Sequence, residues 1–145
     1  MKRRIWKLAG ILLLAGLLAG CKKDEAADHI AGIMEPSQEG YMTNAIAQAA
    51  QQYADDNGLT VTEYTTANDT ADDYMVAVQE AAKPGASVVI GYGEEFEEPL
   101  FTMQKKYKKI KFLILDGAPR KEAGKKAKVR KNTRAVVYDE VQSGF

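Results

Sequence analysis

Residues 111–119, KFLILDGAP, decide how the rest of the sequence is interpreted. The apolar run from Ile110 to Leu115 stops at Asp116, and a turn that begins with Gly117 follows. A short unbroken apolar run bounded by turn residues predicts a strand that is buried on both faces of a sheet. Open α/β sheets bind their ligands at the carboxyl ends of the strands, so Asp116 is a candidate ligand-binding carboxylate. The alternative is an aspartate that only starts the turn.

Helical and strand patterns alternate along the chain on both sides of this stretch. Strands are expected over 29–34, 59–64, 87–90, 110–115 and 135–138, and helices over 41–57, 71–83 and 99–109. Asn68 or Asp69 is expected to cap the second helix. This alternation predicts an α/β fold, a three-layer open parallel sheet with helices on both faces and the flavodoxin-like strand order 2-1-3-4-5.

A second candidate for ligand contact lies at the end of the third expected strand. Gly91, Tyr92 and Gly93 follow the apolar run there. A glycine-rich exit from a strand lets the backbone approach a ligand closely, and Tyr92 would add one ring. A plain connecting loop is the alternative.

The first residues have the pattern of a secretory signal. Positive charges within residues 1–7 are followed by an apolar run from Leu8 to Leu18. That run is shorter than the roughly 20 residues that a membrane-spanning helix needs. It ends in LAGC at residues 18–21, which resembles a bacterial lipobox. Residues 1–20 are therefore predicted to be a lipoprotein signal peptide, and Cys21 the lipidated N-terminus.

A lipidated Cys21 would hold the chain at the cell membrane, on its extracytoplasmic face. Residues 21–28 would be the lipidated cysteine and a polar tether, and residues 29–145 the folded lobe. Each buried methylene contributes about 0.8 kcal/mol, so more than one acyl chain gives a stable anchor. The alternative is an ordinary signal peptide with a coincidental cysteine. Cys21 is the only cysteine, so no intramolecular disulfide can form.

The charge balance argues against nucleic acid as a partner. Removing residues 1–20 takes the 20 basic residues to 16 and leaves 20 acidic ones, a net charge of about −4. Phosphate binding needs net or clustered positive charge. His29 is the only histidine, so metal or triad chemistry has little to work with. With no phosphate-binding glycine motif either, the sequence predicts no enzyme, no cofactor and no metal.

Two charged segments each allow two interpretations. Residues 94–98 carry four carboxylates around Phe96, and hard cations favour oxygen ligands. The spacing of a calcium loop is missing, so a solvated acidic cap before a helix is favoured. Residues 120–134 carry eight Lys or Arg against one Glu. They are expected to form a solvated surface loop, with contact to anionic lipid headgroups or to a transporter as the alternative.

Several motifs occur in a fixed order in the second half of the chain: DDY at 72–74, GASVVI at 85–90, FEEP at 96–99, KFLILDGAP at 111–119, NTRAVVY at 132–138 and EVQSGF at 140–145. From Thr65 onward the sequence resembles the basic membrane protein (BMP) family of lipoproteins, and KFLILDGAP is the closest match. The resemblance implies a type I periplasmic-binding-protein lobe. It also implies a substrate-binding component of an ABC transporter, with nucleosides as the small-molecule ligand and ABC permease subunits as partners.

The resemblance also implies roles for particular residues. Asp116 resembles the aspartate that bonds ribose hydroxyls, and a carboxylate can accept two charge-assisted bonds from a diol. The family usually carries a stacking aromatic and an amide after its first strand, whereas residues 35–44 here read EPSQEGYMTN. Tyr41 would replace the aromatic and Asn44 the amide. Family members have two lobes, so the lobe at 29–145 is expected to be truncated.

A protein of another class remains the alternative. The chain would then be a non-transport lipoprotein that acts as a ligand sensor or a protein-interaction module.

Overall fold

The computed structural model describes residues 29–36 and 41–138, and for residues 41–43 the backbone alone. The elements are β1 (His29–Met34), α2 (Tyr41–Asn57), β2 (Thr60–Thr65), α3 (Ala71–Ala82), β3 (Val88–Tyr92), a 3₁₀ turn η1 (Glu94–Phe96), α4 (Glu97–Lys106), β4 (Lys111–Leu115) and β5 (Thr133–Val136).

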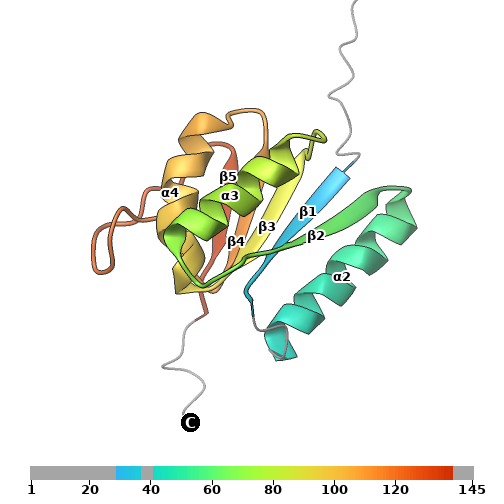
Figure 1. Cartoon of the computed structure of the whole chain (residues 1–145), viewed down its shortest axis with the longest axis horizontal. Helices are drawn as coiled ribbons and strands as arrows, with labels where there is room; N and C mark the ends of the chain where they lie inside the picture. Colours follow the sequence, from blue (N-terminus) through green and yellow to red (C-terminus); the bar gives the residue numbers. More distant parts are fainter. Residues whose placement is uncertain (1–28, 37–40, 139–145) are drawn as a thin grey trace, which may run out of the picture.

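The strands form one parallel sheet in the order β2-β1-β3-β4-β5, with helices packed against it, as Figure 1 shows. The predicted α/β fold and strand order are therefore confirmed. Parallel pairing brings the carboxyl ends of all the strands to one edge of the sheet, which places β3 and β4 exits side by side.

One face of the sheet carries the core. Successive side chains along a strand point to opposite faces of the sheet. On one face, Ala31, Val89 and Ile114 are fully buried in a single cluster with apolar residues of α3 and α4. Tyr74 of α3 and Phe96 of η1 meet in this cluster with their ring centroids 6.0 Å apart. The cluster fixes α3 and α4 over β1, β3 and β4.

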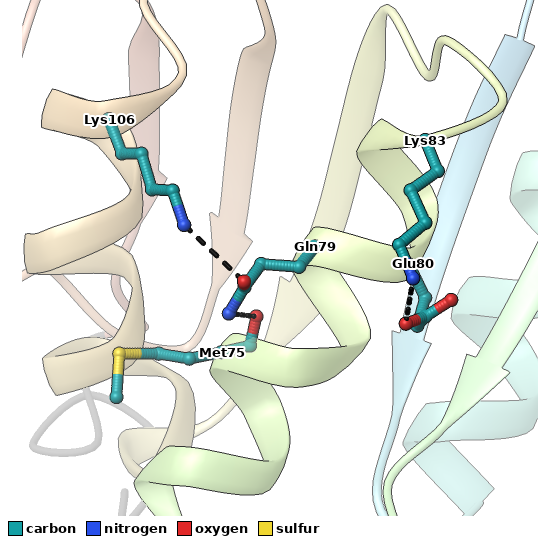
Figure 2. Close-up of polar contacts among 5 residues, drawn as sticks. All are labelled: Met75, Gln79, Glu80, Lys83 and Lys106. Carbon is teal, nitrogen blue, oxygen red and sulfur yellow. Dashed lines mark hydrogen bonds and ion pairs between the residues drawn. The ribbon is translucent and has the colours of Figure 1, made fainter.

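The helices α3 and α4 lie next to each other on this face (Figure 1). Figure 2 shows the polar contact between them, in which Lys106 of α4 donates to the side chain of Gln79 of α3 at 3.4 Å. The side chain of Gln79 also donates to the carbonyl of Met75, one turn earlier, at 3.2 Å. The exposed pair Lys83–Glu80 at the end of α3 contributes little, as surface ion pairs do.

The opposite face is only partly covered by the described residues. There α2 packs against β1 and β2, and an apolar groove of about 740 Å³ lies between α2 and the sheet. Leu113 and Leu115 of β4 line this groove and are half-buried. The prediction of a strand buried on both faces is therefore wrong for β4: only Phe112 and Ile114, on the α3–α4 face, are fully enclosed.

Some predicted boundaries are wrong by a few residues. The strand β3 extends through Gly91 and Tyr92, which pair with Ile114 and Leu115 instead of forming a loop. The strand β5 begins at Thr133, two residues before the expected start. The edge strand β2 begins at Thr60 and ends at Thr65.

The cap of α3 and the bounds of α4 also differ from the sequence prediction. The cap of α3 is Thr70, whose hydroxyl accepts the N–H of Asp73 at 3.2 Å, so neither Asn68 nor Asp69 fills this role. A side chain oxygen at this position satisfies one of the free N–H groups of the first turn. Helix α4 begins at Glu97 and ends at Lys106, earlier than expected at both ends. Pro99 still lies in its first turn, where a missing N–H costs nothing.

Candidate functional site at the carboxyl ends of the strands

Tyr92 and Asp116 lie together where β3 and β4 end. The hydroxyl of Tyr92 donates to Oδ2 of Asp116 at 3.3 Å, and both side chains are half-buried. Tyr92 is the last residue of β3, and Asp116 follows the last residue of β4. The structure therefore brings together two of the residues that the sequence predicted as ligand contacts.

Asp116 has a backbone conformation that few non-glycine residues adopt. Its φ is +55°, and it is the only non-glycine residue with positive φ among those the structure describes. This left-handed conformation costs an L-residue roughly 1–2 kcal/mol. Strained residues of this kind concentrate at binding and catalytic sites, where the surrounding structure holds them.

The electrostatics of this pair follow from its geometry. Burial raises the pKa of Tyr92, and the negative charge of Asp116 and the hydrogen bond to it raise that pKa further. Glu35 and Tyr138 add smaller contributions in the same direction. Tyr92 is therefore a neutral hydrogen-bonding group at physiological pH, beside a carboxylate that accepts.

A small cavity of about 40 Å³ opens at the ends of β1 and β3. Its lining includes Met34, Glu35, Ile46, Tyr92 and Glu95. A cavity of this size holds one or two waters, whereas small-molecule pockets measure roughly 300–1,000 Å³. A ligand of drug size would therefore contact this edge from outside and could place only one group in the cavity.

The predicted glycines have different surroundings. A Cβ on Gly91 would lie 2.2 Å from the ring of Phe96, so this glycine makes room for a core aromatic and also lines the small cavity. Gly93 has a φ of +84°, and its N–H donates to the carbonyl of Leu115 at 3.0 Å. Gly93 thus ties the exit of β3 to the exit of β4.

The residues expected to replace the aromatic and the amide lie at the start of α2. Helix α2 begins at Tyr41, whose side chain lies outside the described residues. The side chain of Asn44 is exposed. Ile46, two residues further along, lines the small cavity, so the first turns of α2 lie beside the carboxyl edge of the sheet. Cys21 and the whole of residues 1–28 lie outside the described residues.

The prediction of a solvated acidic cap is wrong for Glu97. Glu94, Glu95 and Glu98 are exposed as expected, but Glu97 is only 7% exposed. Its carboxylate bonds the N–H of Ala118 and the side chain of Arg120, both in the segment after Asp116. The run of acidic residues does not indicate that Glu97 is buried and paired, because its partners lie more than 20 positions further along the chain.

Two further features are absent from the described ranges. In residues 29–36 and 41–138, no group of three or more His, Cys, Asp or Glu side chains could hold a metal ion. Within the same ranges, no helix has the length and apolar character that crossing a membrane requires. His29 contacts Thr62 on the neighbouring strand at 3.0 Å.

A parallel α/β sheet with polar side chains at its strand exits has the architecture in which open α/β sheets bind ligands at the carboxyl ends of their strands. Within that architecture the family is defined by sequence: the family model described as "ABC transporter substrate-binding protein PnrA-like" matches residues 36–145. The chain belongs to this family, Bmp, which confirms the resemblance found in the sequence. No curated protein matches the chain.

Solved structures are similar in fold. A transcriptional activator of the comK gene from Bacillus halodurans matches with a TM-score of 0.58 and 13% identity, over 73% of this chain and 33% of the other. The lac repressor dimer bound to operator and the anti-inducer ONPF matches with a TM-score of 0.56 and 18% identity, over 72% and 35%. The chain thus spans about one third of the length of these two proteins.

A third structure has a similar length. A fragment of a putative lipoprotein from Peptoclostridium difficile 630 matches with a TM-score of 0.55 and 21% identity, over 81% of this chain and 90% of the other. Because these identities are low, the three matches establish the fold alone and say nothing about the ligand or the partners of this chain.

Proposed function

We propose that this chain provides a ligand-binding lobe of a lipid-anchored, extracytoplasmic substrate-binding protein that delivers a nucleoside to an ABC importer. Membership of the family of ABC transporter substrate-binding proteins supports the transport role. Binding, and not catalysis, is the chemistry expected of such a protein. Its partners would be the permease subunits and the membrane, reached through Cys21.

The Tyr92–Asp116 pair is the observation that carries the nucleoside proposal. A ribose presents two neighbouring hydroxyl groups, and a carboxylate accepts hydrogen bonds from both. The hydroxyl of Tyr92 already donates to Oδ2 of Asp116 at 3.3 Å, so a sugar hydroxyl can replace or join that donor. Tyr92 would add an aromatic edge beside the sugar, and Tyr41 on α2 is the proposed stacking residue for the base.

Calorimetric titration of the full chain in detergent micelles tests this proposal. Inosine, guanosine and adenosine should bind, and the corresponding 2′,3′-dideoxynucleosides should not, because they lack the hydroxyls that Asp116 would accept. Asp116→Asn is the sharpest variant, since asparagine tolerates the left-handed backbone and replaces one acceptor by a donor. Binding of nucleosides and dideoxynucleosides with equal affinity would contradict the role of Asp116.

The lipid anchor needs a separate experiment. Cys21→Ser should move the protein from the membrane fraction of expressing cells to the soluble fraction, because the acyl chains would have no attachment point. Equal membrane retention of the Cys21→Ser variant would refute lipidation at this position. A ligand sensor without transport is the alternative, and it predicts nucleoside binding without any permease partner.

A further inference from the structure

A buried ion pair holds the segment that follows Asp116. Oε1 of Glu97 accepts the backbone N–H of Ala118 at 2.8 Å, and Oε2 of Glu97 lies 2.8 Å from Nε of Arg120. The same Nε of Arg120 also donates to the carbonyl of Ala118 at 3.3 Å. Ala118 therefore has both of its backbone polar groups engaged by this pair, so the pair fixes the orientation of the peptide units on both sides of it.

The placement of Glu97 makes this arrangement rigid. Glu97 is the first residue of α4, which is packed into the core, and its side chain is nearly enclosed. Arg120 is more accessible, with 30% of its side chain exposed. A charged group in this setting is stable only while its partners stay in place, because losing them leaves a buried charge without compensation. Glu97 thus connects the packed core to the segment after Asp116 and holds that segment in place.

The turn between Asp116 and Ala118 is packed against the side chain of Glu97. A Cβ on Gly117 would lie 3.1 Å from the carbonyl oxygen of Gly93 and 3.3 Å from Cγ of Glu97. Gly117 therefore lies between the exit of β3 and the side chain of Glu97. Asp116, whose φ is +55°, is the residue immediately before this tightly packed glycine.

We propose that Glu97 and Arg120 form a latch that keeps Asp116 in its left-handed conformation and so aims its carboxylate at the carboxyl edge of the sheet. Glu97 is then a positioning residue: it touches no ligand and acts through the peptide units of Ala118. The latch offsets the cost of the strained backbone, in the way that supporting hydrogen bonds fix the geometry of binding residues. What the carboxylate binds rests on the proposed function, whereas the latch itself does not.

Nuclear magnetic resonance of the isotopically labelled full chain in detergent micelles tests the latch. A strong nuclear Overhauser cross-peak between the amide proton and Hα of the same residue marks a positive φ, and we expect this cross-peak at Asp116. Glu97→Ala should abolish that cross-peak and speed hydrogen exchange at the Ala118 amide at least about tenfold, as the loss of a hydrogen bond to a charged group requires. The amides of Val89 and Ile114, inside the sheet, should remain protected.

Two further variants separate positioning from general stabilisation. Glu97→Gln keeps an oxygen acceptor for the Ala118 N–H and should restore the Asp116 cross-peak. Glu98→Ala is the matched control, since Glu98 is the exposed neighbour of Glu97 on the same helix turn, and it should change neither readout. Persistence of the Asp116 cross-peak and of slow exchange at Ala118 in folded Glu97→Ala would overturn the latch.

Arg120→Ala decides the matter if Glu97→Ala does not fold. Arg120 is partly exposed, so its removal should leave the sheet amides protected while the Asp116 cross-peak weakens and Ala118 exchanges faster. Wild-type behaviour at both residues in Arg120→Ala would overturn the proposal. Adding guanosine distinguishes the two proposals: if the wild type ignores guanosine while the variants still lose the Asp116 cross-peak, the nucleoside function fails and the latch stands.

Discussion

Asp116 combines the three properties that define the candidate site: its place at a strand exit, its bond to Tyr92 and its left-handed backbone. The first of these is readable in the sequence, because an apolar run that stops at an acidic residue and a glycine marks a strand exit. The other two depend on how β3 and β4 pair. The sequence therefore predicts the position of Asp116, whereas its bond to Tyr92 and its left-handed backbone become visible only in the structure.

The backbone of Asp116 leads to a prediction about stability. Asp116→Ala and Asp116→Gly both remove the bond to Tyr92, so the difference between them reports the left-handed backbone alone. The glycine variant should be more stable than the alanine variant by about 1 kcal/mol, the reverse of their order inside a helix or strand. Urea unfolding of both variants measures the difference. An alanine variant as stable as the glycine variant would contradict a strained Asp116.

Tyr74 gives a prediction about pH. Its side chain is 3% exposed, and its hydroxyl donates to Asp69 at 2.8 Å. Burial raises the pKa of Tyr74 above the ordinary value of 10.0, and the hydrogen bond to Asp69 and its charge raise that pKa further. The unfolded chain therefore releases this proton first, so the stability from neutral Tyr74 is complete below pH 10 and is lost as the pH rises toward the folded pKa.

The measurement is the free energy of unfolding above pH 10, compared between the wild type and Tyr74→Phe. The wild type should lose stability more steeply there, because phenylalanine has no proton to release. Tyr53→Phe is the matched control, since Tyr53 is 59% exposed. Parallel alkaline curves for the wild type and Tyr74→Phe would show that Tyr74 does not titrate differently in the folded state.

At the scale of elements, α4 organises the second half of the chain. Its first turn holds the segment after β4 through Glu97, and its last turns hold the basic segment through Gln104. The buried side chain of Gln104 donates to the carbonyl of Lys128 at 2.9 Å and accepts from Arg130 N–H at 3.1 Å and from the hydroxyl of Thr133 at 3.0 Å. The lysines of that segment are exposed, but its return into β5 is fixed.

Gln104→Ala should therefore be costly. The change leaves the hydroxyl of Thr133, the N–H of Arg130 and the carbonyl of Lys128 without their partner, and Thr133 is fully buried. We expect a loss of about 2–4 kcal/mol in the free energy of unfolding. Gln51→Ala provides the control, because Gln51 is exposed on α2 and its side chain donates to the exposed side chain of Asp55; it should cost less than about 0.5 kcal/mol. Similar losses for both would mean that Gln104 does not anchor the segment.

Part of this organisation was predictable from the sequence. Alternating helix and strand patterns predicted the parallel sheet and its strand order, because only a few sheet topologies are compatible with such an alternation. The pattern Gly91-Tyr92-Gly93 predicts a strand exit, but Gly91 belongs to β3 and accommodates the ring of Phe96. Glu97 and Gln104 escaped prediction because each bonds partners more than 20 residues away. Long-range polar contacts of this kind have no periodic signal in a sequence.

At the scale of the whole molecule, the two faces of the sheet and its carboxyl edge differ in packing and polarity. The α3–α4 face holds the closed core, and the α2 face carries an apolar groove beside β4. The carboxyl edge carries the Tyr92–Asp116 pair, and the cavity that Tyr92 lines there is too small for a nucleoside. A ligand on this edge is therefore held on one side by the described residues, and we expect weak affinity and fast exchange from this lobe.

Titration of the ¹⁵N-labelled full chain with guanosine, followed by nuclear magnetic resonance, tests nucleoside binding at this edge most directly because it detects weak binding residue by residue. The amide signals of Tyr92, Asp116 and Gly117 should shift and saturate, and Asp116→Asn should weaken the interaction by about tenfold or more, as the loss of charge-assisted hydrogen bonds requires. Saturable shifts elsewhere on the sheet, or no shifts at Tyr92 and Asp116 up to the solubility limit of guanosine, would contradict a nucleoside site at the carboxyl edge.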